Sequence, residues 1–381
     1  MSGPVFDAPP PRGNAIKHGI HPPDVIAMWV ADSDFPAPAA VREALAGRVA
    51  TGWYTYEKVG DAVLDGIRGW LRRRHGWDVP RAAVVPVPGV VPACHAAARA
   101  LAAPGDAIVV DTPLYPPLLR LPDAVDARTA LLAWPDASAG ADAGPRLDAA
   151  ALDRAAAGAR VLVLCNPHNP LGHCLRAADL DLVATACEAH DLIVVSDDIW
   201  SDLALPGARY LPAGAHPGLD ARTVTLMAPS KTFGLTGLGF AFAVVTDPGL
   251  RERMEGAWRW HLPFVNDLAL AAAEAAYTDC DAWLDAVIER LAANRELLRR
   301  EAPAALPGAH ITLPEAGYLA WLDLRETPFG AAPAEKLLGL ARVALSDGAE
   351  FGAPGFARLN FACSEERLVE ALARLSAAFR A

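Results

Sequence analysis

Residues 223–238, TVTLMAPSKTFGLTGL, decide the fold prediction. Thr223–Met227 is an apolar run of strand length, and a glycine-punctuated bend follows it. Lys231 lies between the two, so we expect its amine at the edge of a sheet with part of its solvation removed. Such an amine has a lowered pKa and can form a Schiff base with an aldehyde. By position alone, a solvated loop lysine is an equally good interpretation.

The runs on either side of this segment predict an α/β fold. Several are hydrophobic throughout, which is typical of strands covered by helices on both faces. The further strand-like runs are Ala83–Val87, Ala107–Asp111, Thr129–Trp134, Arg160–Cys165, Leu192–Ser196 and Phe240–Thr246. The helical patterns between them are Asp61–His75, with an aspartate cap, Val91–Ala102 and Ala177–His190. This alternation predicts one large domain built on a sheet.

The pattern of predicted elements changes after about residue 250. We expect a long helix, two strand regions and a capped final helix, at Asp281–Arg300, Ala309–Leu324, Ala357–Ala362 and Ser364–Phe379. This pattern predicts a smaller α+β domain. The expected division is an N-terminal arm (1–35) packing with the small domain, a large domain (36–280) and a small C-terminal domain (281–381).

Composition narrows the function classes. The net charge of −11 argues against nucleic acid or an anionic membrane surface as the main partner. No apolar run reaches the roughly 18–20 residues of a membrane helix, and Met1–Arg12 lacks the apolar centre of a signal peptide. We therefore expect a cytoplasmic protein. The cysteines form no C-x-x-C pair, so we expect them reduced and mostly buried, and we expect no metal site.

Lysine is scarce in this chain, which makes Lys231 more conspicuous. Besides Lys231, only Lys17, Lys58 and Lys336 occur among the 34 basic residues. These three lie in ordinary polar or helical surroundings.

Two further segments place polar groups after buried strands, where open α/β sheets bind ligands. Ile193–Asp198, IVVSDD, ends in two acids, and the carboxylate of Asp197 can pair with a protonated ring nitrogen. Capping of a following helix is the ordinary alternative. In Cys165–Gly172, CNPHNPLG, two Asn-Pro steps fix an extended turn and leave the Asn169 amide free for a ligand.

Two other segments are weaker signals. Val87–Pro92, VPGVVP, ends a strand and opens a helix, and free N–H groups at a helix start attract phosphate. Asp111–Pro117, DTPLYPP, offers Tyr115 as a ring to stack on an aromatic cofactor. Taken alone, each is an ordinary turn or loop.

Together and in this order, the strings NPHNPLG, SDDI and SKTFGL resemble fold-type I enzymes that use pyridoxal 5′-phosphate (PLP), the class I/II aminotransferase group. The resemblance runs from about residue 27 to the C-terminus. It implies an aspartate-aminotransferase-like α/β fold, with a mostly parallel seven-stranded sheet in the large domain and a smaller α+β domain. It also implies PLP as the cofactor.

The resemblance assigns roles to individual residues. Lys231 holds PLP as a Schiff base, Asp197 pairs with the pyridine nitrogen and Tyr115 stacks on the ring. Arg358, in ARLNF, matches the arginine that grips the substrate α-carboxylate, a task that suits a guanidinium fork. The full set implied for the cofactor is Lys231, Asp197, Asn169, Tyr115, Gly89, Val90, Val91, Ser230 and Tyr54.

Within the group, the N-terminal half resembles the cystathionine β-lyase, or C–S lyase, branch. Met28–Phe35, MWVADSDF, is similar to its MWVADMDF string, and Trp53–Thr55 and Arg73–Trp77 fit its GYT and RRHGW strings. Gly239 stands where many aminotransferases have a phosphate-binding arginine, which this branch commonly lacks. Substrate contacts are then implied for Arg358, Trp29, Val30 and Ala31.

The same resemblance implies a homodimer in which Tyr54 crosses the interface to the neighbour's PLP phosphate. The chain departs from the branch at Ser33, Asp198, Trp200 and Gly52–Trp53, so a standard cystathionine substrate is not assured.

The implied activity is that of a C–S β-lyase of the EC 4.4.1 type. It would cleave a cysteine S-conjugate by α,β-elimination to a thiol, pyruvate and ammonia, with Lys231 as the general base. The alternatives are a class I/II aminotransferase, a specialised biosynthetic PLP lyase or decarboxylase acting on a larger S-cysteine conjugate, and a PLP-fold protein retained as a binding partner. The expected partners are a small amino-acid substrate and a second copy of the chain.

Overall fold

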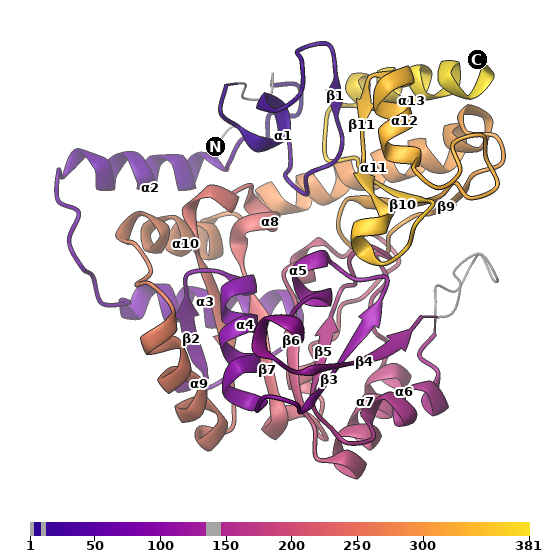
Figure 1. Cartoon of the computed structure of the whole chain (residues 1–381). Helices are drawn as coiled ribbons and strands as arrows, with labels where there is room; N and C mark the ends of the chain where they lie inside the picture. The colour runs from indigo at the N-terminus through magenta and orange to yellow at the C-terminus, as the bar shows by residue number, and fades with distance from the viewer. Residues whose placement is uncertain (1–3, 9–12, 135–145) are drawn as a thin grey trace.

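Figure 1 shows the computed structural model, which describes residues 4–8, 13–134 and 146–381. Of the proline-rich stretch 1–12 only residues 4–8 are described, so the prediction about that stretch lies mostly outside the described residues. Within the described part, no helix is long and apolar enough to cross a membrane.

A seven-stranded sheet forms the centre of the large domain, as predicted. Its order is β2-β8-β7-β6-β5-β3-β4, and β8 runs antiparallel to both of its neighbours, whereas the other pairs are parallel. The strands are β2 (Val84–Val87), β3 (Ala107–Thr112), β4 (Arg128–Ala133), β5 (Ala159–Cys165), β6 (Ile193–Asp197), β7 (Thr223–Met227) and β8 (Ala241–Val244). The predicted α/β class with a mostly parallel sheet is confirmed.

Helices cover both faces of this sheet, which explains why its strands are hydrophobic throughout. In β5, Val161 and Val163 pack with the cluster under α4 and α9, whereas Leu162 and Leu164 pack with the cluster under α6 and α7. Alternate side chains of one strand therefore enter two different cores. The large-domain helices are α2 (Ala39–Ala50), α3 (Asp61–His75), α4 (Val90–Leu101), α5 (Pro116–Leu119), α6 (Ala149–Ala156), α7 (Ala177–His190), α8 (Pro229–Phe233), α9 (Pro248–His261) and α10 (Asp267–Asp279).

The start of α3 corrects one detail of the prediction. The N-cap is Gly60, in an extended conformation, and Asp61 is the first helical residue without a side-chain capping bond. Its carboxylate still lies in the first turn, where a negative charge complements the helix dipole. The helix ends as predicted at Gly76, whose φ of 65° is a left-handed conformation that glycine adopts without strain.

The C-terminal part forms an α+β unit that lies above the large domain in Figure 1. Its four-stranded antiparallel sheet has the order β12-β13-β10-β9. The elements are α11 (Asp281–Ala305), β9 (His310–Thr312), β10 (Leu319–Asp323), α12 (Pro333–Ala341), β11 (Val343–Ala344), β12 (Ser346–Asp347), β13 (Phe356–Asn360) and α13 (Glu365–Arg380). Ser364 caps α13 by accepting the N–H of Arg367, as its sequence position suggested.

The N-terminal arm packs against this C-terminal unit. After α1 (Ile16–Gly19), strand β1 (Ile26–Ala27) pairs in parallel with β11. The segment Met28–Phe35, here called the strap, then runs beside the end of β13, where the Asp34 N–H donates to Ala362 O at 2.9 Å. We propose the division at about residues 35 and 280 on this basis.

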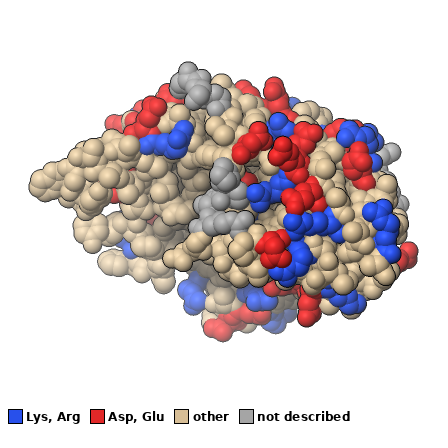
Figure 2. All heavy atoms as spheres, turned by 90° about the horizontal axis from the view of Figure 1, so that it is seen from above, with Lys and Arg blue, Asp and Glu red and all other residues tan. Residues whose placement is uncertain are grey.

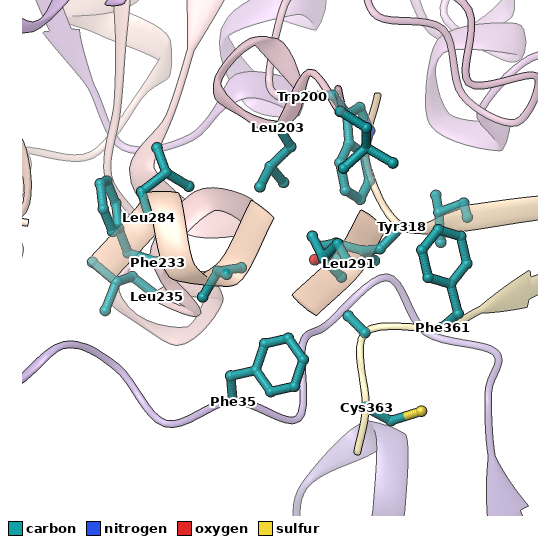
Figure 3. Packing of buried hydrophobic residues seen from close by; sticks show 14 of the residues in the cluster. Phe35, Trp200, Leu203, Phe233, Leu235, Leu284, Leu291, Tyr318, Phe361 and Cys363 are labelled. Carbon is teal, nitrogen blue, oxygen red and sulfur yellow. The ribbon is translucent and has the colours of Figure 1, made fainter. Parts of the chain in front are cut away.

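A large apolar cluster joins the strap, α8 and α11. Figure 3 shows Phe233 and Leu235 beside Leu284, and Trp200 beside Tyr318. The Trp200 and Tyr318 rings meet edge to face, with centroids 4.8 Å apart. The short helix that carries Lys231 is therefore held on a rigid base.

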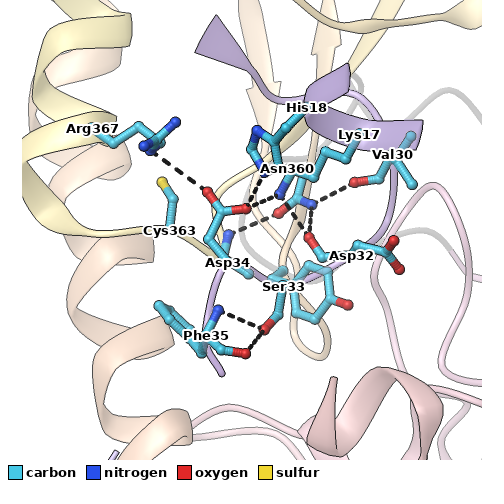
Figure 4. Close-up of polar contacts among 12 residues, drawn as sticks. Lys17, His18, Val30, Asp32, Ser33, Asp34, Phe35, Asn360, Cys363 and Arg367 are labelled. Carbon is cyan, nitrogen blue, oxygen red and sulfur yellow. Dashed lines mark hydrogen bonds and ion pairs between the residues drawn. The ribbon is translucent and has the colours of Figure 1, made fainter. Parts of the chain in front are cut away.

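Lys17 belongs to a buried polar cluster in the N-terminal arm. It is buried, and its Nζ donates to Asp34 Oδ1 at 2.8 Å and to Asp32 O at 2.7 Å. His18 Nε2 lies 2.8 Å from the same Asp34 oxygen (Figure 4). A buried carboxylate needs such partners. Nothing near Lys17 in the sequence indicates this pairing, because 17 residues separate it from Asp34.

Candidate active site

Three neighbouring parallel strands bring the predicted segments together. β5, β6 and β7 lie side by side, and they end at Cys165, Asp197 and Met227. The Asn169 turn follows the first of these strands, and α8 with Lys231 follows the third. Carboxyl ends of parallel strands share one edge of a sheet, which is where such folds bind ligands.

Lys231 lies in α8 with its amine directed at the strap. Its Nζ donates to Ala31 O at 2.8 Å and lies 3.7 Å from Asp32 Oδ1. Burial lowers the pKa of Lys231, and the negative charge of Asp32 opposes that effect in part. An amine in this environment carries less positive charge at neutral pH than a solvated lysine, as nucleophilic or basic chemistry requires.

Asp197 ends β6 as a buried carboxylate. Its Oδ1 accepts the N–H of Ile199 at 3.2 Å, and it does not cap the next helical turn, whose cap position is Trp200. Burial raises the pKa of Asp197 to about 6, although that backbone bond and the charge of Lys231 lower it. A buried acid whose charge is so poorly compensated favours a cationic partner.

Arg358 and Asn169 meet although 189 residues separate them in the sequence. Arg358 Nη1 donates to Asn169 Oδ1 at 2.8 Å, and Nη2 donates to Trp29 O and to Ser346 Oγ, each at 3.2 Å. Its guanidinium carbon lies 4.6 Å from the ring centroid of Phe351. Burial lowers the pKa of Arg358 to about 10, and its buried Nε has no partner among the described residues. A buried guanidinium with an unused donor is suited to an anionic ligand.

The predicted ring and phosphate residues surround the same edge. Tyr115 is half-buried at the start of α5, and burial together with the charge of Asp197 raises its pKa. Gly89 precedes α4, so the Val90 and Val91 amides lie in its first turn, and Ser230 lies in the first turn of α8. Amides in a first helical turn have no partner within the helix.

The strap contributes backbone carbonyls to the site. Trp29 O accepts from Arg358, Val30 O accepts from Asn360 Nδ2 at 2.6 Å, and Ala31 O accepts from Lys231. The indole N–H of Trp29 turns away and donates to Lys17 O at 3.0 Å. Side-chain contacts of Trp29, Val30 and Ala31 with substrate therefore stay a prediction.

Tyr54 is not part of this edge in the single chain. It is exposed, and its hydroxyl group donates to Val49 O at 3.4 Å. This placement is compatible with a role at a neighbouring subunit, which one chain does not test.

Sequence reasoning missed two groups beside Lys231. Asp32 lies within ion-pair distance of its amine, and the hydroxyl group of Tyr318 donates to the same Ala31 oxygen at 3.2 Å. Asp32 stands in the strap string, so an acid near the site could have been suspected. Nothing in the sequence indicated that the fold would bring Asp32 close to Lys231, which lies about 200 residues away along the chain.

The residues that depart from the branch mostly face the interior. Asp198 accepts the hydroxyl groups of Ser196 and Tyr210, and burial raises its pKa to about 7, although these two bonds lower it and the charge of Asp197 adds to the rise. Trp200 is buried against Tyr318, and Ser33 Oγ accepts the Phe35 N–H at 3.1 Å.

A cavity of about 420 Å³ lies beside α3, away from this edge. Several of the charged groups that line it already have partners. His75 Nε2 lies 2.8 Å from Asp202 Oδ1, and Arg73 Nη2 lies 2.9 Å from Asp281 Oδ2. No predicted site residue lines this cavity, so its volume does not identify the active site.

Comparison with known proteins decides the family. The model of the family described as aminotransferase class I and II matches residues 34–375. The chain belongs to this family. Cystathionine beta-lyase PatB of Bacillus subtilis is 34% identical over 364 residues, covering 93% of this chain and 92% of that protein.

Solved structures share the fold of this chain. The crystal structure of OvoB has a TM-score of 0.93 at 33% identity and covers 98% of this chain and 99% of that one. Cystalysin from Treponema denticola, whose crystal structure contains pyridoxal 5′-phosphate, has a TM-score of 0.88 at 27% identity, covering 94% of this chain and 91% of that one.

The donor set at the edge fits PLP. An aldehyde needs a desolvated amine, which Lys231 supplies, and a pyridinium nitrogen needs a buried carboxylate, which Asp197 supplies. A phosphate needs free amides such as those that begin α4. The half-buried Tyr115 ring adds an aromatic face. These residues come from separate segments that the sheet edge collects.

Proposed function

We propose that this protein is a PLP-dependent C–S β-lyase that cleaves a cysteine S-conjugate to a thiol, pyruvate and ammonia. The observation that carries the proposal is the shared edge of β5, β6 and β7, where the Lys231 amine, the Asp197 carboxylate and the Arg358 guanidinium converge. Support for the lyase chemistry comes from relatives named cystathionine beta-lyase at 32–34% identity over most of the chain.

The chain's own residues account for the bond-breaking step. PLP, when bound to Lys231 and Asp197, supplies an electron sink for a carbanion at the substrate Cα. Arg358 holds the α-carboxylate, which orients the Cα–H bond toward the Lys231 amine. Once the substrate amine has replaced it on the cofactor, the freed Lys231 amine would take the Cα proton as general base, and the sulfur would leave from Cβ as a thiolate. Burial lowers the pKa of Lys231, which favours the uncharged amine that a general base requires.

The assembly we propose is a homodimer in which Tyr54 reaches the partner's phosphate site. Large side chains of Trp53, Tyr54, Tyr56 and Phe264 are exposed, and the Tyr56 and Phe264 rings lie 5.3 Å apart. Exposed aromatic groups gathered in this way mark an interaction surface. The end that projects beyond α2 carries few charged side chains, whereas charges of both signs are interspersed elsewhere on the face in Figure 2.

We place the protein in the cytoplasm. The six cysteines are buried and free, which suits a reducing compartment.

A product assay tests the proposed reaction. Purified protein with PLP is incubated with cystathionine and a panel of S-substituted cysteines, and thiol and pyruvate are measured. We expect equal amounts of the two products, and we expect Lys231→Ala to abolish turnover. An intact keto acid that forms only when an acceptor is added would instead establish an aminotransferase.

Subunit mixing tests the assembly. Lys231→Ala and Tyr54→Ala chains should each be inactive or nearly so. Hybrids of the two contain one site with both an intact lysine and an intact tyrosine. Recovery of activity on mixing supports the proposed homodimer, and absence of recovery in proven hybrids contradicts it.

A further inference from the structure

We propose that Asp32 is a catalytic residue, and that it forms with the Ala31 carbonyl the docking position of the Lys231 ammonium group during the reaction. This inference rests on the proposed function, because it assigns a partner to the base of that reaction. The resemblance gave no role to Asp32, and Ala31 was expected only as a substrate contact.

The geometry places two groups of the strap on one amine. Ala31 O accepts from Lys231 Nζ at 2.8 Å, and Asp32 Oδ1 lies 3.7 Å from that nitrogen. Tyr318 donates to Ala31 O from the other side at 3.2 Å, so that the carbonyl is fixed between two donors. A free lysine amine is thus held at a defined point rather than left to sample rotamers.

The strap itself is firmly anchored. Asn360 Nδ2 donates to Val30 O at 2.6 Å and to Asp32 O at 2.7 Å, and Lys17 Nζ donates to Asp32 O at 2.7 Å. Figure 4 shows these donors around the strap. The backbone carbonyl groups of Val30 and Asp32 are therefore both held by hydrogen bonds, which fixes the position from which the Asp32 side chain projects.

The negative charge of Asp32 is needed at the step in which Lys231 becomes protonated. The Cα–H bond breaks and Lys231 Nζ gains the proton. The electron pair forms the Cα–Cβ double bond, and the Cβ–S bond breaks with its pair on sulfur. Lys231 is then an ammonium shielded from solvent by burial, where an unpaired cation is costly. Asp32 stabilises that cation until the proton passes to the departing sulfur.

Other groups that face the amine do not perform this task. Arg358 and Asp197 both influence Lys231 electrostatically, Arg358 as a like charge and Asp197 as a carboxylate reserved for the ring nitrogen. Asp32 is the carboxylate within ion-pair distance of Nζ among the described residues.

The test compares the reactivity of Lys231 in Asp32→Asn, Asp32→Glu and wild-type full-length protein without PLP. Each is treated with a limiting acylating reagent between pH 6 and pH 10, and modification of each lysine is followed by peptide mass spectrometry. The exposed Lys58 is the internal reference. Asp24→Asn is the matched control, because it removes the same charge from the N-terminal arm at an exposed carboxylate paired with Arg342.

We expect Asp32→Asn to move the midpoint of the Lys231 rate profile to lower pH. Its acylation rate at pH 7 should rise by about threefold or more relative to Lys58, because removal of a nearby opposite charge leaves more uncharged amine. The plateau at high pH should not change. Asp24→Asn should match wild type, and Asp32→Glu should lie between the two. In the product assay, kcat of Asp32→Asn should fall about tenfold or more.

An unchanged midpoint in Asp32→Asn would overturn the inference, as would an equal shift in Asp24→Asn. This readout does not depend on the lyase reaction. A wild-type protein that yields no thiol and pyruvate would contradict the proposed function, while the Lys231 profile would still decide the role of Asp32.

Discussion

Two polar clusters contact the strap, and their charged groups are paired to different degrees. In the arm cluster, Lys17 and His18 each lie 2.8 Å from one oxygen of Asp34, and Arg367 lies 3.6 Å from the other. In the proposed catalytic cluster of Lys231, Asp197, Arg358 and Asp32, Lys231 Nζ lies 3.7 Å from Asp32 Oδ1, the one ion pair among these four side chains. Asp34, Asp197 and Arg358 are all buried, but only Asp34 has an ion-pair partner among the described residues.

The carboxylates of the two clusters show the same contrast. Burial raises the pKa of Asp34, yet the His18 bond and the Lys17 charge outweigh that effect and lower it overall. At Asp197 burial prevails and raises the pKa to about 6. The comparison teaches that the arm cluster stabilises the fold, whereas the catalytic cluster keeps charge available for a ligand.

The largest effect should come from breaking the arm cluster. Lys17→Met leaves Asp34 buried without its ammonium partner, so the free energy of unfolding should fall by about 3–5 kcal/mol. Urea denaturation at pH 7 measures it. Lys58→Met, at an exposed lysine, is the control and should change stability by less than about 0.5 kcal/mol. A loss at residue 17 no larger than the control would remove the distinction between the clusters.

Asp197→Asn should show the opposite division between stability and activity. With an amide in place of the carboxylate, the ring nitrogen loses its counter-charge, and kcat/KM should fall by about a hundredfold or more. Stability at pH 7 should not fall, because the burial of this charge is unfavourable in the cofactor-free fold. Steady-state kinetics and urea denaturation on the same preparation measure both. A variant that loses stability but keeps activity would reverse the two assignments.

The pH dependence of folding stability tests the cost of burying a second carboxylate, Asp198, beside Asp197. Its folded pKa of about 7 lies above the unfolded value of 3.8, mainly because of burial. Between these values the folded state binds more protons, so wild-type stability falls as pH rises through this window. In protein without PLP, Asp198→Asn should therefore gain about 2–3 kcal/mol relative to wild type between pH 5 and pH 8. Denaturation curves at the two pH values test this, and a constant difference would refute it.

The smallest effect concerns the geometry of the guanidinium. Arg358→Lys keeps one positive charge but loses the planar fork that contacts Asn169, Ser346 and the strap. KM for an S-substituted cysteine should rise about tenfold with a smaller change in kcat. Initial rates across substrate concentrations separate the two constants, and an unchanged KM would exclude Arg358 from carboxylate binding.

The strands, most helices and the segments that carry Lys231, Asp197 and Asn169 could be predicted because they depend on local signals, whereas Arg358 was assigned only through the family resemblance. An apolar run, a glycine bend or an Asn-Pro step is visible within a few residues. The arm cluster and Asp32 could not be predicted in this way, since Lys17 meets Asp34, and Asp32 meets Lys231, only through the path of the strap. The predicted cap of α3 was wrong because aspartate is favoured both at the N-cap and in the first turn of a helix. Asp61 lies in the first turn, and Gly60 is the N-cap.

The central claim is that Lys231 holds the cofactor at this edge. The most direct measurement is borohydride reduction of the protein loaded with PLP, followed by peptide mass spectrometry. With only four lysines in the chain, the assignment is unambiguous. The account predicts the added cofactor mass on Lys231 alone. Modification at Lys17, Lys58 or Lys336 in its place, or at no lysine, would contradict it.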